Sequence, residues 1–434
     1  MLSNSQVVDL ARALESHLQA QDGDLTDFLP LIRMHLYFAQ RPAAHMASPA
    51  AGAGRLRMLV DVVTGVGRML QARLVGIRCR QVFVAPATHR NVPRGGALES
   101  KHLDSLVERY ARDGDAIWEL RPVPPGVTVD RSLPCAVLAV ARLLARLRGP
   151  SRRVRALRDQ LDAYAQACEP ELNWDLPRLE LSLATFETAR GIFYWLFRRS
   201  DIRRAFFVCY YGAAQFPLLA ALNDLGRETV EYQHGIQSDV QPMYSGWEHL
   251  QRKPASMPDR VLLWDGVALR RISRWADALG IETEEVGNLW FAAMFKEAPP
   301  HSSSRSILVA LQLYPSHFNE NILDAMQQSL DLEWVFREHP YAVLSAEQRD
   351  ALLERNPRLR IISPTDEPLE ASLARCTVCI TGFSTVGLEA VYCGRRAIFT
   401  HENAREGLAD YIDDERCFYA AEAADILRLV RGEG

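Results

Sequence analysis

The stretch Thr377-Val-Cys-Ile-Thr-Gly-Phe-Ser-Thr-Val-Gly-Leu-Glu-Ala390 contains the unit from which the fold is built. It starts with a run of apolar or β-branched residues, which predicts a buried strand ending near Thr381. A turn follows at Gly382, and Ser384 or Thr385 then caps a helix. Strands that pass directly into helices form parallel sheets with both faces covered.

The same alternation of apolar strand and helix recurs on both sides of this stretch. The predicted strands lie at residues 81–85, 116–120, 205–210, 229–232, 261–264, 283–286, 306–310, 332–336, 359–362, 377–381 and 397–399. A segment with two prolines and three serines at 299–305 is a typical linker. We therefore predict an α/β protein with two doubly wound domains: residues 1–298, which carry extra N-terminal helices, and residues 306–434.

Composition narrows the classes of function. The chain has 434 residues and a formal net charge of -4, so no overall positive field favours nucleic acid. The first residues lack the basic start and apolar centre of a signal peptide, and no run of 18 apolar residues occurs. We expect a cytoplasmic protein that can work at the inner face of the membrane.

Two motifs have the sequence of metal sites, but their positions in the chain argue against metal binding. Cys376 and Cys379 form a CxxC inside the predicted strand, with no second pair at zinc spacing, so we interpret them as core residues. Asp113 and Asp115 form a DxD that precedes a strand, and we interpret it as a turn. We predict no metal and no cofactor.

Polar residues follow the predicted strands of the first domain. Glu231-Tyr-Gln-His-Gly235 lies at the end of the strand 229–232, where ligands bind in parallel sheets. An imidazole there titrates near neutral pH and suits a general base, which makes His234 a catalytic candidate. The alternative is a structural histidine bonded to a backbone carbonyl. Gln233 beside it is a candidate for the acceptor side.

Two loops of the second domain could hold a phosphate. Arg337 and His339 directly follow the strand 332–336, and a solvated loop is the alternative. Around Gly382, Ser384 and Thr385, the start of a helix offers free N–H groups and partial positive charge, and an ordinary capped helix is the alternative. Glu389 lies about one turn further, where it could reach a ribose hydroxyl.

Residues 88–99 read as a polar loop, and the segment Gly95–His102 leads from it into a helix. Through Glu99 and Lys101 this segment could line the acceptor side, and a solvated loop is the alternative. The arginine-rich stretch 142–158 and the aromatic residues at 193–197 could contact an anionic membrane. Aromatic residues in a helix are more often part of the core.

Together, these motifs resemble those of GT-B glycosyltransferases, especially the CDP-glycerol polymerases and the CMP-sialic acid and CMP-Kdo transferases. Those enzymes carry an HP pair and, some 40 to 50 residues later, an SS or ST pair, which match His339-Pro340 and Ser384-Thr385. The His-Gly pair of the polymerases matches His234-Gly235, and Val286-Gly287-Asn288 is similar to a signpost between the two domains. The resemblance covers about residues 205 to 412. Gln233 stands where the polymerases usually have Trp, and the polar loop that follows there is missing, which favours a sugar over glycerol phosphate as the transferred group.

The resemblance implies two domains facing a cleft and a metal-independent glycosyltransferase of surface polysaccharide assembly, such as capsule or lipopolysaccharide. His234 would be the base, and the donor would contact Arg337, His339, Gly382, Ser384, Thr385, Glu389 and Asn288. The donor would be a nucleotide sugar, CMP- or CDP-linked by preference and UDP-linked otherwise, and the acceptor a glycan or a lipid-linked glycan. If Glu231 or Glu338 attacks the sugar instead, retention results. The alternatives are a nucleotide-sugar epimerase or hydrolase and a non-catalytic binding module.

Overall fold

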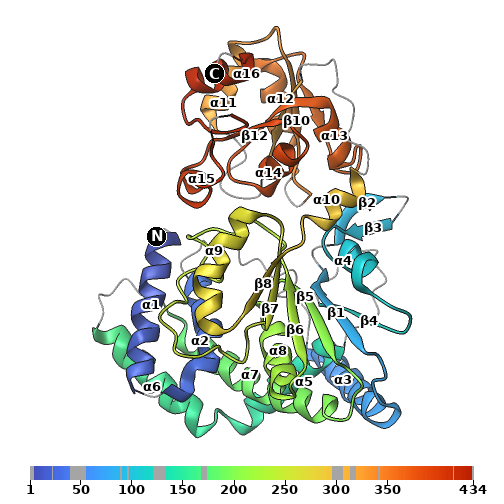
Figure 1. Ribbon diagram of the computed structural model, residues 1–434, viewed down its shortest axis with the longest axis vertical. Helices are drawn as coiled ribbons and strands as arrows, with labels where there is room; N and C mark the ends of the chain where they lie inside the picture. Colours follow the sequence, from blue (N-terminus) through green and yellow to red (C-terminus); the bar gives the residue numbers. More distant parts are fainter. Residues whose placement is uncertain are drawn as a thin grey trace. The chain divides into compact units, whose positions relative to one another are not determined.

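The computed structural model describes residues 4–21, 23–39, 55–87, 90–94, 97–120, 133–167, 174–295, 306–312, 319–340, 343–413 and 415–432. Contacts divide the chain into two compact units (Figure 1). The first unit is Met1–Arg90 with His102–Gly287, and the second is Asn91–Lys101 with Asn288–Gly434. The predicted linker at 299–305 lies outside the described residues.

The first unit is built on a parallel sheet of six strands in the order β4-β1-β5-β6-β7-β8. Strand β4 joins one side of β1, and strands β5 to β8 follow on the other side, so the order reverses between β1 and β5. The strands are β1 Gln81–Pro86, β4 Ala116–Leu120, β5 Arg204–Val208, β6 Glu228–Tyr232, β7 Arg260–Leu263 and β8 Glu282–Glu285.

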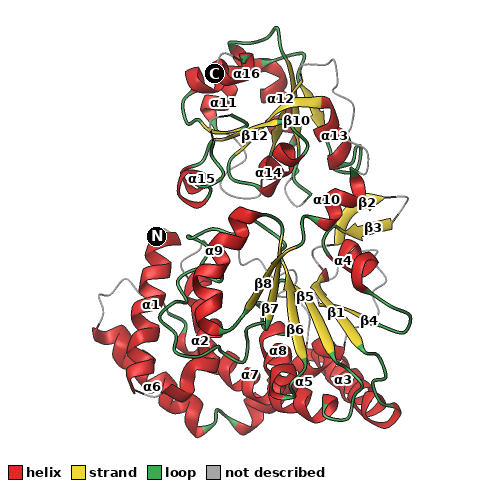
Figure 2. Cartoon of the chain, viewed as in Figure 1, coloured by secondary structure: helices red, strands yellow, loops and turns green. Residues whose placement is uncertain are grey.

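Helices surround this sheet (Figure 2). They are α1 Asn4–Gln21, α2 Leu29–Ala39, α3 Arg55–Val75, α4 Leu103–Tyr110, α5 Leu133–Arg148, α6 Arg152–Ala167, α7 Leu176–Phe197, α8 Gln215–Asp224 and α9 Gly266–Ala276, with 3-10 turns at Gly23–Phe28 and Asp277–Leu279. The 266–279 segment ends at Gly280, whose φ of 67° is left-handed and favours glycine.

The second unit has its own parallel sheet of six strands, in the order β11-β10-β9-β12-β13-β14. The order reverses between β9 and β12, as in the Rossmann fold. The strands are β9 Ser306–Ala310, β10 Glu333–Arg337, β11 Arg360–Ile362, β12 Cys376–Thr381, β13 Arg396–Phe399 and β14 Cys417–Tyr419. The helices are α10 Leu289–Met294, α11 Glu320–Gln327, α12 Ala346–Arg355, α13 Leu369–Arg375, α14 Thr385–Tyr392, α15 Glu402–Gly407 and α16 Ala423–Arg431.

Strand β9 shows why both faces of the second sheet are covered. Ile307 and Val309 belong to a core with α11, α12 and α16, whereas Leu308 and Ala310 belong to a second core with α13 and α14. Alternate residues of a strand point to opposite faces, so an unbroken apolar strand needs helices on both sides. The prediction of two doubly wound α/β domains is confirmed, and each unit is Rossmann-like. The cleft between them stays a prediction.

Three short strands differ from the sequence-based expectation. Where a polar loop was expected at 88–99, β2 Arg90–Arg94 and β3 Ala97–Ser100 form a two-stranded sheet. Strand β14 was not predicted. Such strands carry too few residues for a periodic pattern, and sheet pairing defines them.

The two cysteines of the CxxC are buried in the core between the second sheet and α13 and α14. Burial raises the pKa of Cys376 to about 12 and that of Cys379 well above its usual value, so neither thiol ionises near neutral pH. A register shift between Cys376 and Val378 lets two residues three apart reach the same face.

A buried ion pair fixes the N-terminal helices on the first unit. Arg33 of α2 and Glu15 of α1 are both fully buried, with Arg33 Nε 2.7 Å from Glu15 Oε1. The same guanidinium donates to the carbonyl oxygens of Pro242, Ser245 and Gly246, at 2.9, 2.6 and 3.0 Å. The loop that follows β6 is therefore held by two helices that precede the sheet in sequence.

Candidate active site

The turn after β6 is shaped by a buried glutamine. The Gln233 side chain is fully buried, its Oε1 accepts from the N–H of Trp264 at 2.8 Å and its Nε2 donates to the carbonyl of Gly235 at 2.9 Å. The amide therefore ties the end of β6 to the end of β7 and bends the backbone on either side of His234. The geometry gives Gln233 a structural role, where sequence suggested an acceptor contact.

His234 follows β6, and its side chain is 14% exposed. Its ring packs 5.8 Å from the ring of Tyr211 and 6.2 Å from that of Tyr244, measured between centroids. Its Nδ1 lies 3.5 Å from the Tyr244 hydroxyl and 4.0 Å from Glu231 Oε1. Aromatic contacts and polar atoms on one side thus fix the plane of the imidazole.

Glu231 is buried beneath His234. One carboxyl oxygen, Oε1, accepts from the N–H of Tyr210 at 3.2 Å and from the Tyr244 hydroxyl, whereas Oε2 has no hydrogen-bond partner among the described residues. Burial raises the pKa of Glu231 to about 8, because a carboxylate away from water is unfavourable. At pH 7 the carboxyl group is therefore mostly neutral.

These contacts favour one tautomer of His234. The Tyr244 hydroxyl donates its single hydrogen to Glu231, so its oxygen is left to accept from Nδ1–H of His234. An imidazole protonated at Nδ1 has its lone pair at Nε2. The cluster can thus hold a histidine ready to accept a proton at Nε2.

Backbone strain marks the neighbouring strand end. Cys209, directly after β5, has a φ of 73°, which a side chain other than glycine rarely adopts. Its position beside β1 is the point where the strand order reverses, and ligands of open parallel sheets bind at such points. Non-glycine residues in the left-handed region cluster at functional sites. Nothing in the sequence pattern singled this residue out.

In the second unit, the reversal between β9 and β12 is bridged by Gln312. Its Oε1 accepts from the N–H of Phe383 at 3.0 Å, and its side chain lies so close to Gly382 that a Cβ there would come within 2.7 Å of Nε2. Thr381 Oγ1 donates to the carbonyl of Ala310 at 3.0 Å. Gln312 thus orders the turn that leads into α14, and its amide occupies the space that a side chain at Gly382 would take.

Helix α14 begins at this edge as the sequence predicted. Ser384 is its N-cap, with a side chain that accepts from the N–H of Val386 at 3.4 Å, and Thr385 is its first residue. Both are partly exposed. Gly387 allows the helix to lie against β13, because a Cβ there would come within 2.4 Å of the Phe399 ring. The helix start is therefore pressed onto the sheet with its N–H groups at the ligand-binding edge.

The structure brings together two residues for which sequence suggested different roles. Glu389 of α14 is fully buried and pairs through Oε1 with the ammonium group of Lys101. Lys101 also lies over the ring of Trp290, 4.5 Å from its centroid, and is 15% exposed. Glu389 Oε2 has no hydrogen-bond partner among the described residues. Asn288, predicted as a donor contact, is the N-cap of α10 and accepts from the N–H of Phe291 at 3.1 Å.

Two neighbouring residues at the end of β10 are directed into the protein. Arg337 is buried and donates to Ser372 Oγ of α13 at 3.1 Å. Burial lowers its pKa to about 10. Glu338 is also buried, and its Oε1 accepts from Arg349 at 2.6 Å and from the N–H of Leu344 at 2.8 Å. His339 is partly exposed and follows directly. Glu338 is thus bound within the protein, as is the Arg337 guanidinium.

The remaining predicted residues lie elsewhere. Glu99 is a partly exposed residue of β3. The Asp115 carboxylate accepts from the N–H groups of Arg112 and Gln81, at 2.8 and 3.0 Å, which is the turn that sequence indicated. Among the described residues, no group of three or more His, Cys, Asp or Glu could hold a metal ion. No helix in the described parts is long and apolar enough to cross a membrane.

Sequence reasoning found His234 and the start of α14 because each follows a recognisable strand. It missed Tyr244, Cys209 and Gln312. Tyr244 lies in an irregular loop, and Gln312 adjoins a short polar segment, so neither has a periodic or motif signal. Only the sheet order shows that Gln312 lies beside Gly382.

Comparison with protein-family models and with curated protein sequences returns no match. Among solved structures, the chain is similar to Anabaena HepE in complex with UDP, at 12% identity over 81% of this chain and 89% of that one, with a TM-score of 0.41. It is similar to Neisseria meningitidis UDP-GlcNAc 2-epimerase bound to UDP-GlcNAc, at 9% identity over 81% and 90%, with a TM-score of 0.46. It is also similar to Acinetobacter baumannii MurG, at 12% identity over 82% and 90%, with a TM-score of 0.45.

Proposed function

We propose that this protein is a glycosyltransferase that moves a sugar from a nucleotide donor to an acceptor hydroxyl. The observation that carries the proposal is the cluster of His234, Tyr244 and Glu231 at the strand end of the first sheet. It supplies a proton acceptor whose orientation is fixed by buried groups. A transferase needs such a base, because the acceptor hydroxyl must lose its proton as it attacks.

The reaction proceeds as a single displacement. The acceptor oxygen forms a bond to the anomeric carbon, the bond from that carbon to the donor phosphate breaks, and the acceptor proton moves to His234 Nε2. The nucleotide leaves with the bonding electrons. The imidazolium that forms keeps its Nδ1–H directed at the Tyr244 hydroxyl, 3.5 Å away, which in turn donates to Glu231. Attack from the face opposite the leaving group inverts the anomeric configuration.

The donor is assigned to the second unit. The N–H groups at the start of α14 and the side chains of Ser384, Thr385 and His339 would hold the leaving phosphate. The cytidine preference rests on the resemblance of the His-Pro and Ser-Thr pairs. Arg337 would act by shaping the loop through Ser372. The burial of Glu389 beneath Lys101 supports a positioning role, in which Glu389 fixes the ammonium group, over the ribose contact that sequence suggested.

Two measurements test this function. A thermal-shift screen with CMP, CDP, UDP, GDP and dTDP identifies the nucleotide, and the matching nucleotide sugar is then incubated with and without candidate acceptors. We expect nucleotide release that depends on the acceptor and persists in EDTA. Conversion of the donor sugar or nucleotide release without any acceptor would instead identify an epimerase or hydrolase. If no nucleotide shifts the midpoint, the protein is a binding module of another kind.

A peripheral membrane contact is part of the proposal, although the surface differs from the predicted one. Phe193 and Phe197 are core residues. Helix α3 instead exposes an apolar stripe, with Val63 64%, Leu70 52% and Leu74 84% exposed, and Arg73 lies beside it over the Trp195 ring. Apolar stripes flanked by arginine bind anionic interfaces. We expect sedimentation with phosphatidylglycerol vesicles, reduced by Leu70→Ser with Leu74→Ser, and no sedimentation with phosphatidylcholine.

A further inference from the structure

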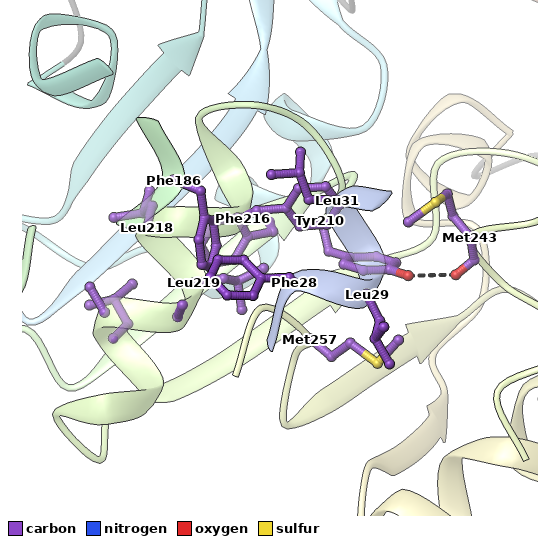
Figure 3. Packing of buried hydrophobic residues seen from close by; sticks show 14 of the residues in the cluster. Phe28, Leu29, Leu31, Phe186, Tyr210, Phe216, Leu218, Leu219, Met243 and Met257 are labelled. Atoms are coloured by element: carbon purple, nitrogen blue, oxygen red, sulfur yellow. Dashed lines mark hydrogen bonds between the residues drawn. The ribbon is translucent and has the colours of Figure 1, made fainter. Parts of the chain in front are cut away.

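The first unit contains a cavity that the proposed chemistry does not use. Its volume is about 630 Å³, and it lies between the C-terminal half of α2, the middle of α5 and the N-terminal parts of α7 and α8. This size is typical of sites for small organic ligands. Figure 3 shows three of its lining residues within the packed core. The apolar lining includes Leu31, Met34, Phe38, Leu138, Phe186 and Phe216.

Positive charge lies at the wall of this cavity. Arg142 of α5 and Arg178 of α7 both line it and are exposed, and neither guanidinium has a hydrogen bond or an ion pair among the described residues. Although Arg142 is exposed overall, partial loss of solvent at the cavity wall, together with the charges of Arg146 and Arg178, lowers its pKa. Two like charges near one another favour an anion between them.

The other titratable groups that line the cavity, His35 and Asp175, offset the charge of the two arginines only in part. Burial and the charge of Arg178 lower the pKa of His35 to about 4, so the imidazole is neutral at pH 7. Asp175 also lines the cavity, and its Oδ1 accepts from the N–H of Arg178 at 3.0 Å as the cap of α7. The cavity thus has an apolar interior and a rim with two arginines and one carboxylate, that of Asp175, which caps α7.

The cavity adjoins the turn after β5, which packs against the proposed base. Its lining includes Ala213 and Phe216, which directly follow the turn after β5. Tyr211 in that turn packs against His234, with 5.8 Å between ring centroids. The ring of Phe216 lies 6.2 Å from that of Tyr210, which belongs to the same turn. A ligand held in the cavity is therefore next to the segment that positions His234.

We propose that this cavity binds the hydrocarbon chain of an amphiphilic acceptor whose anionic group lies between Arg142 and Arg178. The acceptor role rests on the proposed function, whereas binding of the chain does not. A phosphate on a lipid and the carboxylate of a fatty acid share the required chemistry. The chain displaces water from apolar walls, and the anion gains charge-assisted hydrogen bonds from the guanidinium groups.

Calorimetry of the full chain without donor tests binding, with decyl phosphate, decanoate and decanol as probes below their aggregation limits. We expect the two anions to bind and the neutral decanol to bind roughly tenfold more weakly or worse, since a charge-assisted contact contributes at least about one decade. The preference between the two anions tells a phosphate source from a carboxylate source.

Three variants locate the site. Arg142→Gln with Arg178→Gln reduces decyl phosphate binding to the level of decanol, because both residues are exposed and only the head group loses its partners. The matched control, Arg152→Gln with Arg155→Gln, removes two exposed arginines of α6 that do not line the cavity and leaves binding unchanged. Ser182→Trp places a large side chain in the cavity and abolishes binding of all three probes, with the unfolding midpoint as the check on folding.

The outcomes separate this inference from the proposed function. If decyl phosphate does not bind the parent protein, or binds Ser182→Trp equally well, the cavity is not its site and the inference is wrong. If the double arginine variant keeps the preference for anions, the head-group assignment is wrong. If the probes bind as expected but no sugar is transferred to an amphiphilic acceptor, the cavity stands and the transferase proposal fails.

Discussion

Two glutamates at the ligand-binding edges of the two sheets are buried to the same extent and surrounded in opposite ways. Glu231 in the first unit meets a tyrosine hydroxyl and a backbone N–H, and Glu389 in the second meets the ammonium group of Lys101. Each has one carboxyl oxygen without a hydrogen-bond partner among the described residues. Burial alone therefore does not determine what a carboxyl group does, because neutral donors leave it able to take up a proton and a cation fixes its charge.

The largest expected effect concerns His234, which lies above Glu231. His234→Ala should slow transfer by about 10²–10⁴-fold and leave nucleotide affinity within a few-fold, because loss of a general base affects the reaction and not the binding of the donor. Steady-state kinetics and calorimetry measure the two. His17→Ala, at an exposed position of α1, is the control. Turnover near that of the parent would remove His234 from the mechanism.

The second glutamate should respond most to removal of its cation. Lys101→Met leaves a buried carboxylate unpaired, which costs about 3–5 kcal/mol of unfolding free energy. Adding Glu389→Gln should restore most of the loss, since the uncompensated charge is gone. Denaturant unfolding of the two single variants and the double variant gives the coupling. Additive effects would show that the pair does not hold its charge as described.

Glu231 should make the free energy of unfolding depend on pH. Its folded-state pKa of about 8 is above the ordinary carboxyl value of 4.5, so the folded state binds the extra proton between these values. Stability from this group is full below about pH 4.5, falls as the pH rises and is lost above about pH 8. Glu231→Gln should therefore be more stable than the parent at pH 8.5, by on the order of a few kcal/mol, and similar to it at pH 4.5. Melting curves at the two pH values decide this, and an equal difference at both would contradict the assigned pKa.

The smallest expected effect distinguishes two roles of Ser384, that of the cap of α14 and that of a contact to the nucleotide. Ser384→Ala should cost about 1 kcal/mol of stability through the lost cap and weaken nucleotide binding roughly tenfold. Ser345→Ala is the matched control, because Ser345 caps α12 in the same unit. We expect a similar loss of stability there with unchanged nucleotide affinity. Equal effects of the two variants on affinity would assign Ser384 to the fold only.

The two glutamates also show what sequence could and could not predict. The strands that precede them were found because long apolar runs bounded by turns are a local signal. His234 and Ser384 followed from those strand ends. The partner of Glu389 could not be found in this way, since Lys101 is separated from it by most of the chain and reaches it through a segment with no periodic pattern. Tyr244 is close in sequence to Glu231, but only the course of an irregular loop brings its hydroxyl there.

The hydrogen bonds from Arg33 to three carbonyls of the loop after β6 affect the order in which the chain folds. During synthesis, Glu15 and Arg33 leave the ribosome long before Pro242 and Gly246. Helices α1 and α2 are therefore made before the loop to which they bind. Until it arrives, three of the guanidinium's five hydrogen-bond contacts are missing. The loop that carries Tyr244 can settle only when this contact closes. Formation of the His234 cluster therefore depends on synthesis of the first unit at least as far as Gly246.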